Sequence, residues 1–207
     1  MPPEGPVIAT IVEGAGEVKA LPTLLRRIAV DTGTYDLSVP SPWRLRRDRF
    51  SRDLGAAAAA AAARVSGAGG LLVVLDADDD CPVELATHLA GIARERVSHC
   101  PVEVAVASRE FEAWFLASAP ALLAHRDVVA QLTVPDPDAP RGAKEKLEEA
   151  MSRKYSPTLH QPAFAALMDM ETAASCSRSF RHFREAVIRL LAWVGPSSSE
   201  EPPTIVG

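Results

Sequence analysis

The sequence has few cysteines and no long apolar run. Its 207 residues include only three cysteines, which have none of the spacings of a zinc finger, and their odd number argues against a disulfide framework. No run approaches the roughly 20 apolar residues of a transmembrane helix, which excludes a membrane span of that kind. The N-terminal residues lack the basic and apolar regions of a secretory leader. We therefore expect a cytoplasmic protein in a reducing compartment, with no membrane partner.

The sequence also has no excess of basic residues over acidic residues. The 22 Lys and Arg residues are outnumbered by 27 Asp and Glu residues, which gives a formal net charge of -5. This balance excludes a uniformly basic nucleic-acid coat protein, although a local basic face can still bind a polyanion. With 47% hydrophobic and 24% charged residues, the composition is that of a globular chain long enough to bury a core.

Several common nucleotide-binding and ion-binding motifs are missing. The sequence has no Gly-Lys-Ser/Thr, so it has no P-loop. Gly14 and Gly16 begin a dinucleotide fingerprint, but Lys19 occupies the position of its third glycine. A calcium-binding EF-hand loop starting at Asp76 fails because Cys81 replaces the required glycine. These three kinds of site are excluded.

The sequence does contain an alternation of strand-like and helix-like segments. Strands are predicted where short aliphatic runs occur, at residues 7–12, 71–75 and 102–107. Helices are predicted where apolar residues recur at helical spacing or alanine dominates, at residues 17–28, 56–63, 82–92, 110–117, 142–155, 161–168 and 180–193. This order favours an α/β fold with a mostly parallel sheet and flanking helices, in which ligands bind at the carboxyl ends of the strands.

The same pattern divides the chain into three parts. Residues 1–118 contain all the predicted strands and form the α/β core. Residues 119–194 contain only predicted helices and form a helical C-terminal extension. Residues 195–207 are rich in Pro, Ser and Glu, which predicts a disordered tail.

Acidic residues follow two of the predicted strands. Glu13 follows the first strand, and Asp76 and Asp78 follow the second. Alternate residues of a strand project to the same side, so Asp76 and Asp78 repel each other unless a cation neutralises them. Carboxylate oxygens are the ligands that hard divalent ions such as Mg²⁺ prefer. The sequence therefore predicts a metal site at the carboxyl edge of the sheet.

The ordered set of acids resembles the Toprim domain, which topoisomerases, primases and the overcoming-lysogenization-defect nucleases share. In that family a glutamate closes the first strand and an Asp-x-Asp pair closes a later one, as Glu13, Asp76 and Asp78 do here. Together they hold Mg²⁺ near a phosphodiester. The nuclease branch adds a second glutamate four residues after the first, which Glu17 matches.

A closer resemblance is to a family of small bacterial Toprim-like proteins known as domain of unknown function 4276. Its pattern includes Val-Glu-Gly-x-x-Glu, an Asp-x-Asp-Asp stretch and a Glu-x-Trp motif, which Glu112-Ala113-Trp114 matches here. Its C-terminal region resembles Lys144, Tyr155 and Ser179-Phe180. The resemblance covers most of the chain up to about Trp193.

The resemblance implies a Toprim-like, Rossmann-like fold and a nuclease that cleaves phosphodiester bonds with Mg²⁺ or Mn²⁺ as cofactor. Glu13, Asp76 and Asp78 would be its catalytic residues. The same three residues would bind the metal together with Glu17 and Glu112. Glu112 has a second interpretation, as a first-turn acid of the helix that follows, and Glu110 shares both interpretations.

Other functions remain as alternatives. Nuclease relatives carry an ATPase, so the resemblance implies a separate ATPase subunit as partner, within a phage-defence system. A second interpretation is a non-catalytic or partner-activated module that binds nucleic acid or nucleotide. A third is a nucleotide-binding protein whose acids hold Mg²⁺ with the nucleotide. Topoisomerase activity is excluded, because strand passage needs a much longer chain and neither Tyr35 nor Tyr155 has the supporting residues of a nucleophile.

An arginine cluster supplies the candidate contacts to nucleic acid. Its members lie in a segment broken by prolines, predicted to be a surface loop or an edge strand: Arg44, Arg46, Arg47, Arg49 and Arg52. We expect Arg44, Arg46 and Arg47 to contact phosphates. The alternative is a solvated loop in which the arginines pair with Asp48 and Asp53. Lys144 is added as a phosphate contact by the resemblance alone, and its alternative is a solvated helix face.

Overall fold

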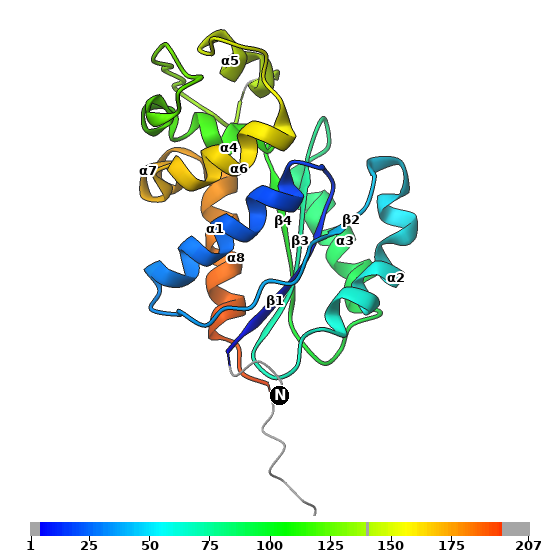
Figure 1. Ribbon diagram of the computed structural model, residues 1–207. Coiled ribbons are helices and arrows are strands. Elements are labelled where there is room, and N and C mark those ends of the chain that lie inside the picture. Colours follow the sequence, from blue (N-terminus) through cyan, green and yellow to red (C-terminus); the bar gives the residue numbers. More distant parts are fainter. Residues whose placement is uncertain (1–4, 140, 196–207) are drawn as a thin grey trace, which may run out of the picture.

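A four-stranded sheet forms the centre of the protein, and helices cover both of its faces (Figure 1). The computed structural model describes residues 5–139 and 141–195, so the predicted tail, apart from residue 195, lies outside the described residues. In spatial order the strands are β2 (Trp43–Arg44), β1 (Val7–Val12), β3 (Gly69–Asp76) and β4 (Val102–Ala107). Each strand is parallel to its neighbours. The predicted α/β class with a parallel sheet is confirmed.

The aliphatic runs form the strands that their pattern predicts. β1 and β4 have the predicted bounds, and β3 extends the predicted run by two glycines and Asp76. Gly69 has a φ of +105°, and a Cβ there would collide with the backbone of Val7, so this extension depends on glycine. The two-residue strand β2 lies in the segment predicted to be a loop or an edge strand.

Long helices cover the two faces of the sheet (Figure 1). One face carries α1 (Glu17–Asp31) and α8 (Arg178–Ala192), and the other carries α2 (Phe50–Ala62) and α3 (Pro82–Arg94). Neighbouring residues of a strand point to opposite faces, so Leu72 packs with α1 and α8 whereas Val73 packs with α2 and α3. Because both faces are covered, β1, β3 and β4 are mostly aliphatic and do not show regular alternation with polar residues.

Shorter helices lie beyond the carboxyl ends of the strands, in the upper part of Figure 1. They are α4 (Glu112–Leu116), the 3₁₀ helix η2 (Ala119–Ala124), α5 (Ala143–Glu149), α6 (Pro157–Leu167) and α7 (Met170–Cys176). α6 packs against α1, and Phe164 of α6 belongs to the same core cluster as Ile8 of β1. The helices after residue 118 thus share a core with the sheet. None of the described helices is long and apolar enough to cross a membrane.

Several parts of the helical segment differ from the prediction, since α6 begins four residues before its predicted start and η2 is not among the predicted helices. The helix predicted over 142–155 is limited to α5, because the Glu148 carboxylate accepts the backbone N–H of Tyr155 at 2.7 Å and turns the chain back. The periodicity does not predict α7. Its N-cap, Asp169, accepts two backbone N–H groups of the first turn, which is the local interaction that starts this short helix.

Candidate functional site

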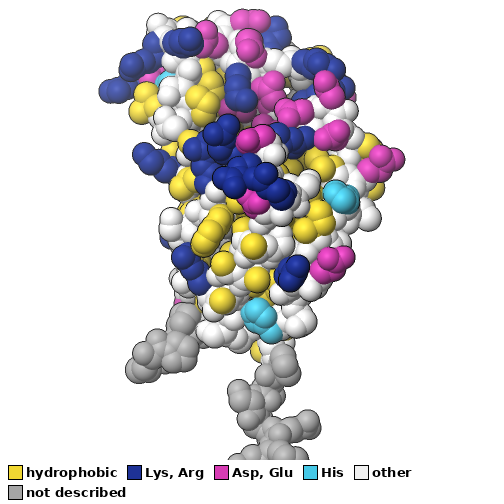
Figure 2. Space-filling model, turned by 90° about the vertical axis from the view of Figure 1, so that its right-hand side faces the viewer, with side chains coloured by type: hydrophobic (Ala, Val, Ile, Leu, Met, Phe, Trp, Pro, Cys, Tyr) yellow, Lys and Arg dark blue, Asp and Glu magenta, His cyan; other side chains and the backbone are white. Residues whose placement is uncertain are grey.

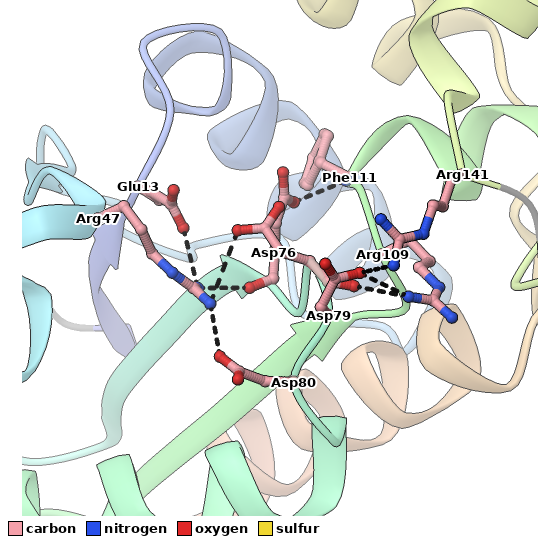
Figure 3. A network of polar contacts seen from close by, with 9 residues as sticks. Glu13, Arg47, Asp76, Asp79, Asp80, Arg109, Phe111 and Arg141 are labelled. Atoms are coloured by element: carbon pink, nitrogen blue, oxygen red, sulfur yellow. Dashed lines mark hydrogen bonds and ion pairs between the residues drawn. The ribbon is translucent and has the colours of Figure 1, made fainter.

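The structure brings the acids of two strands to one edge of the sheet. β1 and β3 are neighbours, with Val12 opposite Val74, so Glu13 follows β1 close to Asp76, the last residue of β3 (Figure 3). A cavity of about 270 Å³ opens at this edge. Its lining includes four of the predicted metal ligands and one lysine: Glu13, Glu17, Asp76, Glu112 and Lys144.

The turn between β1 and α1 is built around the carboxylate of Glu17. Glu17 Oε2 accepts the backbone N–H groups of Glu13 at 3.2 Å and of Gly14 at 3.1 Å. A Cβ at Gly14 would collide with this carboxylate, and a Cβ at Gly16 would collide with Gln161. The two glycines therefore allow a buried acid and its neighbours to pack closely against the backbone of the turn.

Asp76 links β3 to the segment that leads into α4. Its Oδ1 accepts the backbone N–H of Phe111 at 2.7 Å (Figure 3). Burial raises the pKa of Asp76 well above its usual range, and the nearby carboxylates of Glu17 and Glu112 raise it further. The ammonium of Lys144 opposes this shift. The surroundings of Asp76 therefore favour a proton or another cation on its carboxylate.

Glu112 is fully buried and is held by one of its two oxygens. Its Oε1 accepts hydrogen bonds from the Tyr155 hydroxyl and from Gln161 Nε2, both at 3.0 Å. Among the described residues its Oε2 has no hydrogen-bond partner, and Lys144 Nζ lies 3.7 Å from it. Burial, followed by the charge of Glu112, raises the pKa of Tyr155, so the phenol stays protonated and donates. One oxygen of Glu112 is thus fixed, and the other is free to accept.

Glu110 has a structural role instead. Its carboxylate accepts the backbone N–H groups of Gly142 and Lys144, both at 3.2 Å, at the start of α5. This contact brings Lys144 to the cavity. Burial lowers the pKa of Lys144, but the carboxylates of Glu112 and Asp76 raise it more, so its pKa lies above the usual value and the ammonium stays charged. The two glutamates therefore differ in position: Glu112 lines the cavity, whereas Glu110 caps the start of α5.

Raising the pH should destabilise the protein through Glu17. Burial raises the pKa of Glu17 from 4.5 to about 7. Between these values the folded state binds more protons than the unfolded state, so the free energy of unfolding falls as the pH rises. The full shift corresponds to roughly 3 kcal/mol. Glu17→Gln keeps an oxygen acceptor for the turn and should flatten this dependence, as measured by denaturant unfolding between about pH 5 and pH 8 without divalent cations.

A matched control for this experiment is Glu84→Gln. Glu84 is an exposed acid on α3 outside the cavity, so its removal changes the net charge equally and should leave the pH dependence as in the wild type. A Glu17→Gln protein with the wild-type dependence would contradict the prediction.

Asp78 does not join the other predicted ligands. Its φ of +49° is left-handed, and its exposed side chain contacts Arg47, whose Nη2 lies 3.7 Å from Asp78 Oδ2. Arg109, just after β4, also has a left-handed φ of +66°, and its carbonyl oxygen accepts the Asp78 N–H at 3.0 Å. The alternation of a strand predicts one side for Asp76 and Asp78, but β3 ends at Asp76, and the turn that follows redirects Asp78.

The remaining predicted ligands share a cavity but do not enclose an ion. Within residues 5–139 and 141–195, no group of three or more His, Cys, Asp or Glu side chains is arranged to hold a metal. Each of the four acids has an oxygen engaged with the protein: Glu13 with Arg47, Glu17 with its turn, Asp76 with Phe111, and Glu112 with Tyr155 and Gln161. The site therefore has the oxygen donors of a cation site without its closed geometry.

The arginine cluster lies beside this edge. Figure 2 shows Lys and Arg side chains gathered next to Asp and Glu side chains on the face that lies at the right of Figure 1. Arg44 Nε donates to the carbonyl oxygen of Glu13 at 3.1 Å, and Arg47 Nη1 donates to that of Asp76 at 2.7 Å. The others pair within their own segment, Arg46 with Asp48, and Arg49 and Arg52 with Asp53. The pairs with Asp48 and Asp53 are those of the solvated-loop interpretation, and contacts of Arg44, Arg46 and Arg47 to phosphate stay a prediction.

Sequence reasoning missed the partner residues of Glu112. Gln161 lies on α6 and reaches Glu112 only because α6 packs against α1. No motif or periodicity marks it as a site residue. Tyr155 matches the family pattern, but its role as a donor to Glu112 depends on the chain reversal after α5, which the helix prediction over 142–155 did not contain.

Comparisons with known proteins identify one family. The model of a family described as "Domain of unknown function (DUF4276)" matches residues 12–188, which include all four acids of the cavity and Lys144. No curated protein and no solved structure is significantly similar to the chain.

Proposed function

We propose that this chain, which belongs to the family of domain of unknown function 4276, is a Toprim-like enzyme that cleaves phosphodiester bonds of nucleic acid with Mg²⁺ or Mn²⁺. The observation that carries the proposal is the convergence of carboxyl groups from the ends of β1 and β3 and the starts of α1 and α4 on one cavity. The Toprim-like assignment is supported by the acids that follow two adjacent parallel strands.

The four acids of the cavity offer the type of ligand atom that a hard divalent cation binds. All are carboxylate oxygens, the ligands that Mg²⁺ and Mn²⁺ prefer. Glu112 Oε2 is buried without a hydrogen-bond partner among the described residues. The raised pKa values of Glu17 and Asp76 indicate that positive charge in the cavity is favourable. Since these acids do not enclose an ion as they stand, the proposal includes side-chain rotation when the cation binds.

The protein's own residues would bind and orient the phosphate. Lys144, next to Glu112, presents a positive charge to the cavity. The amino end of α6 lines the same cavity through Pro157 and Thr158, and its backbone dipoles favour an anion. Tyr155 and Gln161 keep Glu112 in place. A bound divalent cation would offset charge on the phosphate and make a bound water more acidic.

The reaction class is hydrolysis rather than strand transfer. Tyr155 donates its hydroxyl proton to Glu112 and has a raised pKa, which makes it a poor nucleophile. Tyr35 is 81% exposed and is not part of the cavity lining. The proposal therefore assigns Glu13, Asp76, Glu17 and Glu112 to cation binding and places Asp78 outside the cavity, beside Arg47. A separate ATPase partner in phage defence stays a prediction from the family resemblance.

Cleavage of defined nucleic acids tests the proposal directly. The purified full chain is incubated with single-stranded and double-stranded DNA and RNA, in the presence of Mn²⁺, Mg²⁺ or a chelator. We expect cleavage of at least one substrate with metal and none with chelator. Binding of a substrate without cleavage under any of these conditions would contradict the proposal and favour the binding module.

The exposed arginines of the cluster should contribute to nucleic-acid binding. Arg44 and Arg46 are exposed beside the acidic edge, and each phosphate contact adds about one to the slope of log K against log salt. Arg44→Ala with Arg46→Ala should weaken binding and lower this slope by about two. Arg49→Ala with Arg52→Ala is the matched control, because it removes two charges from the same segment and, unlike Arg44, neither side chain contacts the acidic edge among the described residues. Equal slopes in the two double variants would contradict a specific role for Arg44 and Arg46.

A further inference from the structure

The guanidinium group of Arg47 lies among the acids of the sheet edge (Figure 3). Its Nη1 donates to the carbonyl oxygen of Asp76 at 2.7 Å and lies 3.5 Å from Glu13 Oε2. Its Nη2 lies 2.8 Å from Asp80 Oδ2 and 3.7 Å from Asp78 Oδ2. One cation thus contacts groups that follow both β1 and β3.

The position of Arg47 is set by buried neighbours in the chain. Two residues before it, Leu45 is buried and its N–H donates to the carbonyl oxygen of Val12, the last residue of β1, at 2.9 Å. Three residues after it, Phe50 is 2% exposed in the core beneath the sheet. Arg47 begins the 3₁₀ helix η1 (Arg47–Arg49) between these two anchors. The backbone of Arg47 is therefore held next to the edge by the residues on either side of it.

Other arginines of the segment do not share this arrangement. Among the described residues, Arg44 contacts a carbonyl oxygen of the edge and no carboxylate, and Arg46 pairs with Asp48 in its own segment. The Arg47 side chain is 33% exposed, less than that of Arg46 at 73%. Arg47 therefore compensates the negative charge of this edge in a way that its neighbours do not.

Arg47 also accounts for the division of the predicted ligands. Glu13 lines the cavity but has its Oε2 toward Arg47, and Asp78 contacts Arg47 outside the cavity. Burial raises the pKa of Glu13, and Arg47 acts against that shift. Glu13, one of the four acids assigned to the divalent cation, is thus already paired with the guanidinium.

We infer that Arg47 is a built-in counter-ion of the acidic edge, and that a divalent cation in the cavity binds Glu13 only in competition with it. The inference rests on the proposed metal-dependent function, of which it is a regulatory feature. A nucleic-acid phosphate pairs with guanidinium in a bidentate manner, so substrate that engages Arg47 would release Glu13 for the cation. Cation and substrate would then favour each other's binding.

Calorimetric titration of Mn²⁺ into the metal-free full chain tests the inference without using catalysis. Arg47→Met removes the charge and keeps the length of the side chain, and it should bind Mn²⁺ about tenfold more tightly than the wild type. Arg47→Lys keeps the charge but cannot bridge acids on both sides, and it should bind Mn²⁺ about threefold more tightly. Circular dichroism verifies that each variant is folded. If Arg47→Met does not fold, the Mn²⁺ affinity of Arg47→Lys still tests the inference.

The control is Arg44→Met, which removes the same charge from the same edge without touching a carboxylate. It should leave the Mn²⁺ affinity within about twofold of the wild type, because exposed charges are strongly screened. The inference is overturned if Arg44→Met tightens binding as much as Arg47→Met, if neither Arg47 variant tightens it, or if no variant binds Mn²⁺. Tighter Mn²⁺ binding by the Arg47 variants, with no cleavage of nucleic acid by the wild type, would support the inference and contradict the proposed nuclease activity. Cleavage by the wild type, with unchanged Mn²⁺ affinities in the Arg47 variants, would support the nuclease activity and contradict the inference.

Discussion

Asp76→Asn should reduce metal-dependent cleavage by about a hundredfold to a thousandfold while leaving the fold intact. The asparagine amide keeps an oxygen that can accept the Phe111 N–H, so the link between β3 and α4 is preserved. The variant loses one of the carboxyl groups that line the proposed cation site. Removing a partly buried acid whose pKa is raised should also increase the stability of the metal-free protein. Cleavage rates with Mn²⁺ and melting curves with chelator measure the two effects.

Glu103→Gln is the control for this charge change. Glu103 lies on β4, where it pairs with Arg189 at 2.9 Å, and it is not part of the cavity lining. This variant should cleave at the wild-type rate. Wild-type activity in Asp76→Asn would exclude the cavity as the site of cleavage, even if the protein is a nuclease.

Trp114→Ala should lower the free energy of unfolding by about 3–5 kcal/mol. Trp114 is fully buried and stacks on Phe183 with ring centroids 4.7 Å apart. It also contacts Phe180 edge-on at 5.6 Å, and its Nε1 donates to Ser179 Oγ at 2.9 Å. Its removal leaves a large cavity between α4 and α8 and takes away a hydrogen-bond donor to that hydroxyl. Urea unfolding followed by circular dichroism measures the loss.

The same variant tests how the site is supported. α4 has only five residues and carries Glu112 two positions before Trp114, so its placement depends on this ring. Trp43→Ala is the matched control, because Trp43 is 42% exposed on β2 and should cost less than about 1 kcal/mol. A loss for Trp114→Ala no larger than that of the control would show that the aromatic cluster does not hold α4.

The sheet and part of the site follow from the sequence because they depend on local pattern. Aliphatic runs with no polar alternation define β1 and β3 as strands covered on both faces, and parallel pairing then places Glu13 near Asp76. The position of Asp78 does not follow, because it depends on a left-handed backbone that the strand alternation does not contain. The helix α7 could not be predicted from periodicity, because a helix of seven residues is too short to show a repeat of apolar positions.

The contacts around Glu112 and Arg47 depend on tertiary structure. Gln161 and Tyr155 reach Glu112 through the packing of α6 and the chain reversal after α5. Arg47 looks like its neighbours in the sequence, and only the anchoring of Leu45 and Phe50 distinguishes it. The sequence therefore predicts which residue types meet at the edge, whereas their hydrogen bonds and ion pairs have to be read from the fold.

The strand order has a kinetic consequence. Every pair in the sheet joins segments that are separated by a crossover, and β1 meets β3 through the pairing of Val7 with Gly69. Each of these pairings closes a long loop, and the chain entropy lost in closing it is not compensated until the strands have made contact. Folding is slow for this reason. Helices α1 and α2 lie within those loops and can form first. The repulsion between Glu13 and Asp76 exists only after β1 and β3 have paired, so it opposes a late step and leaves early collapse unaffected.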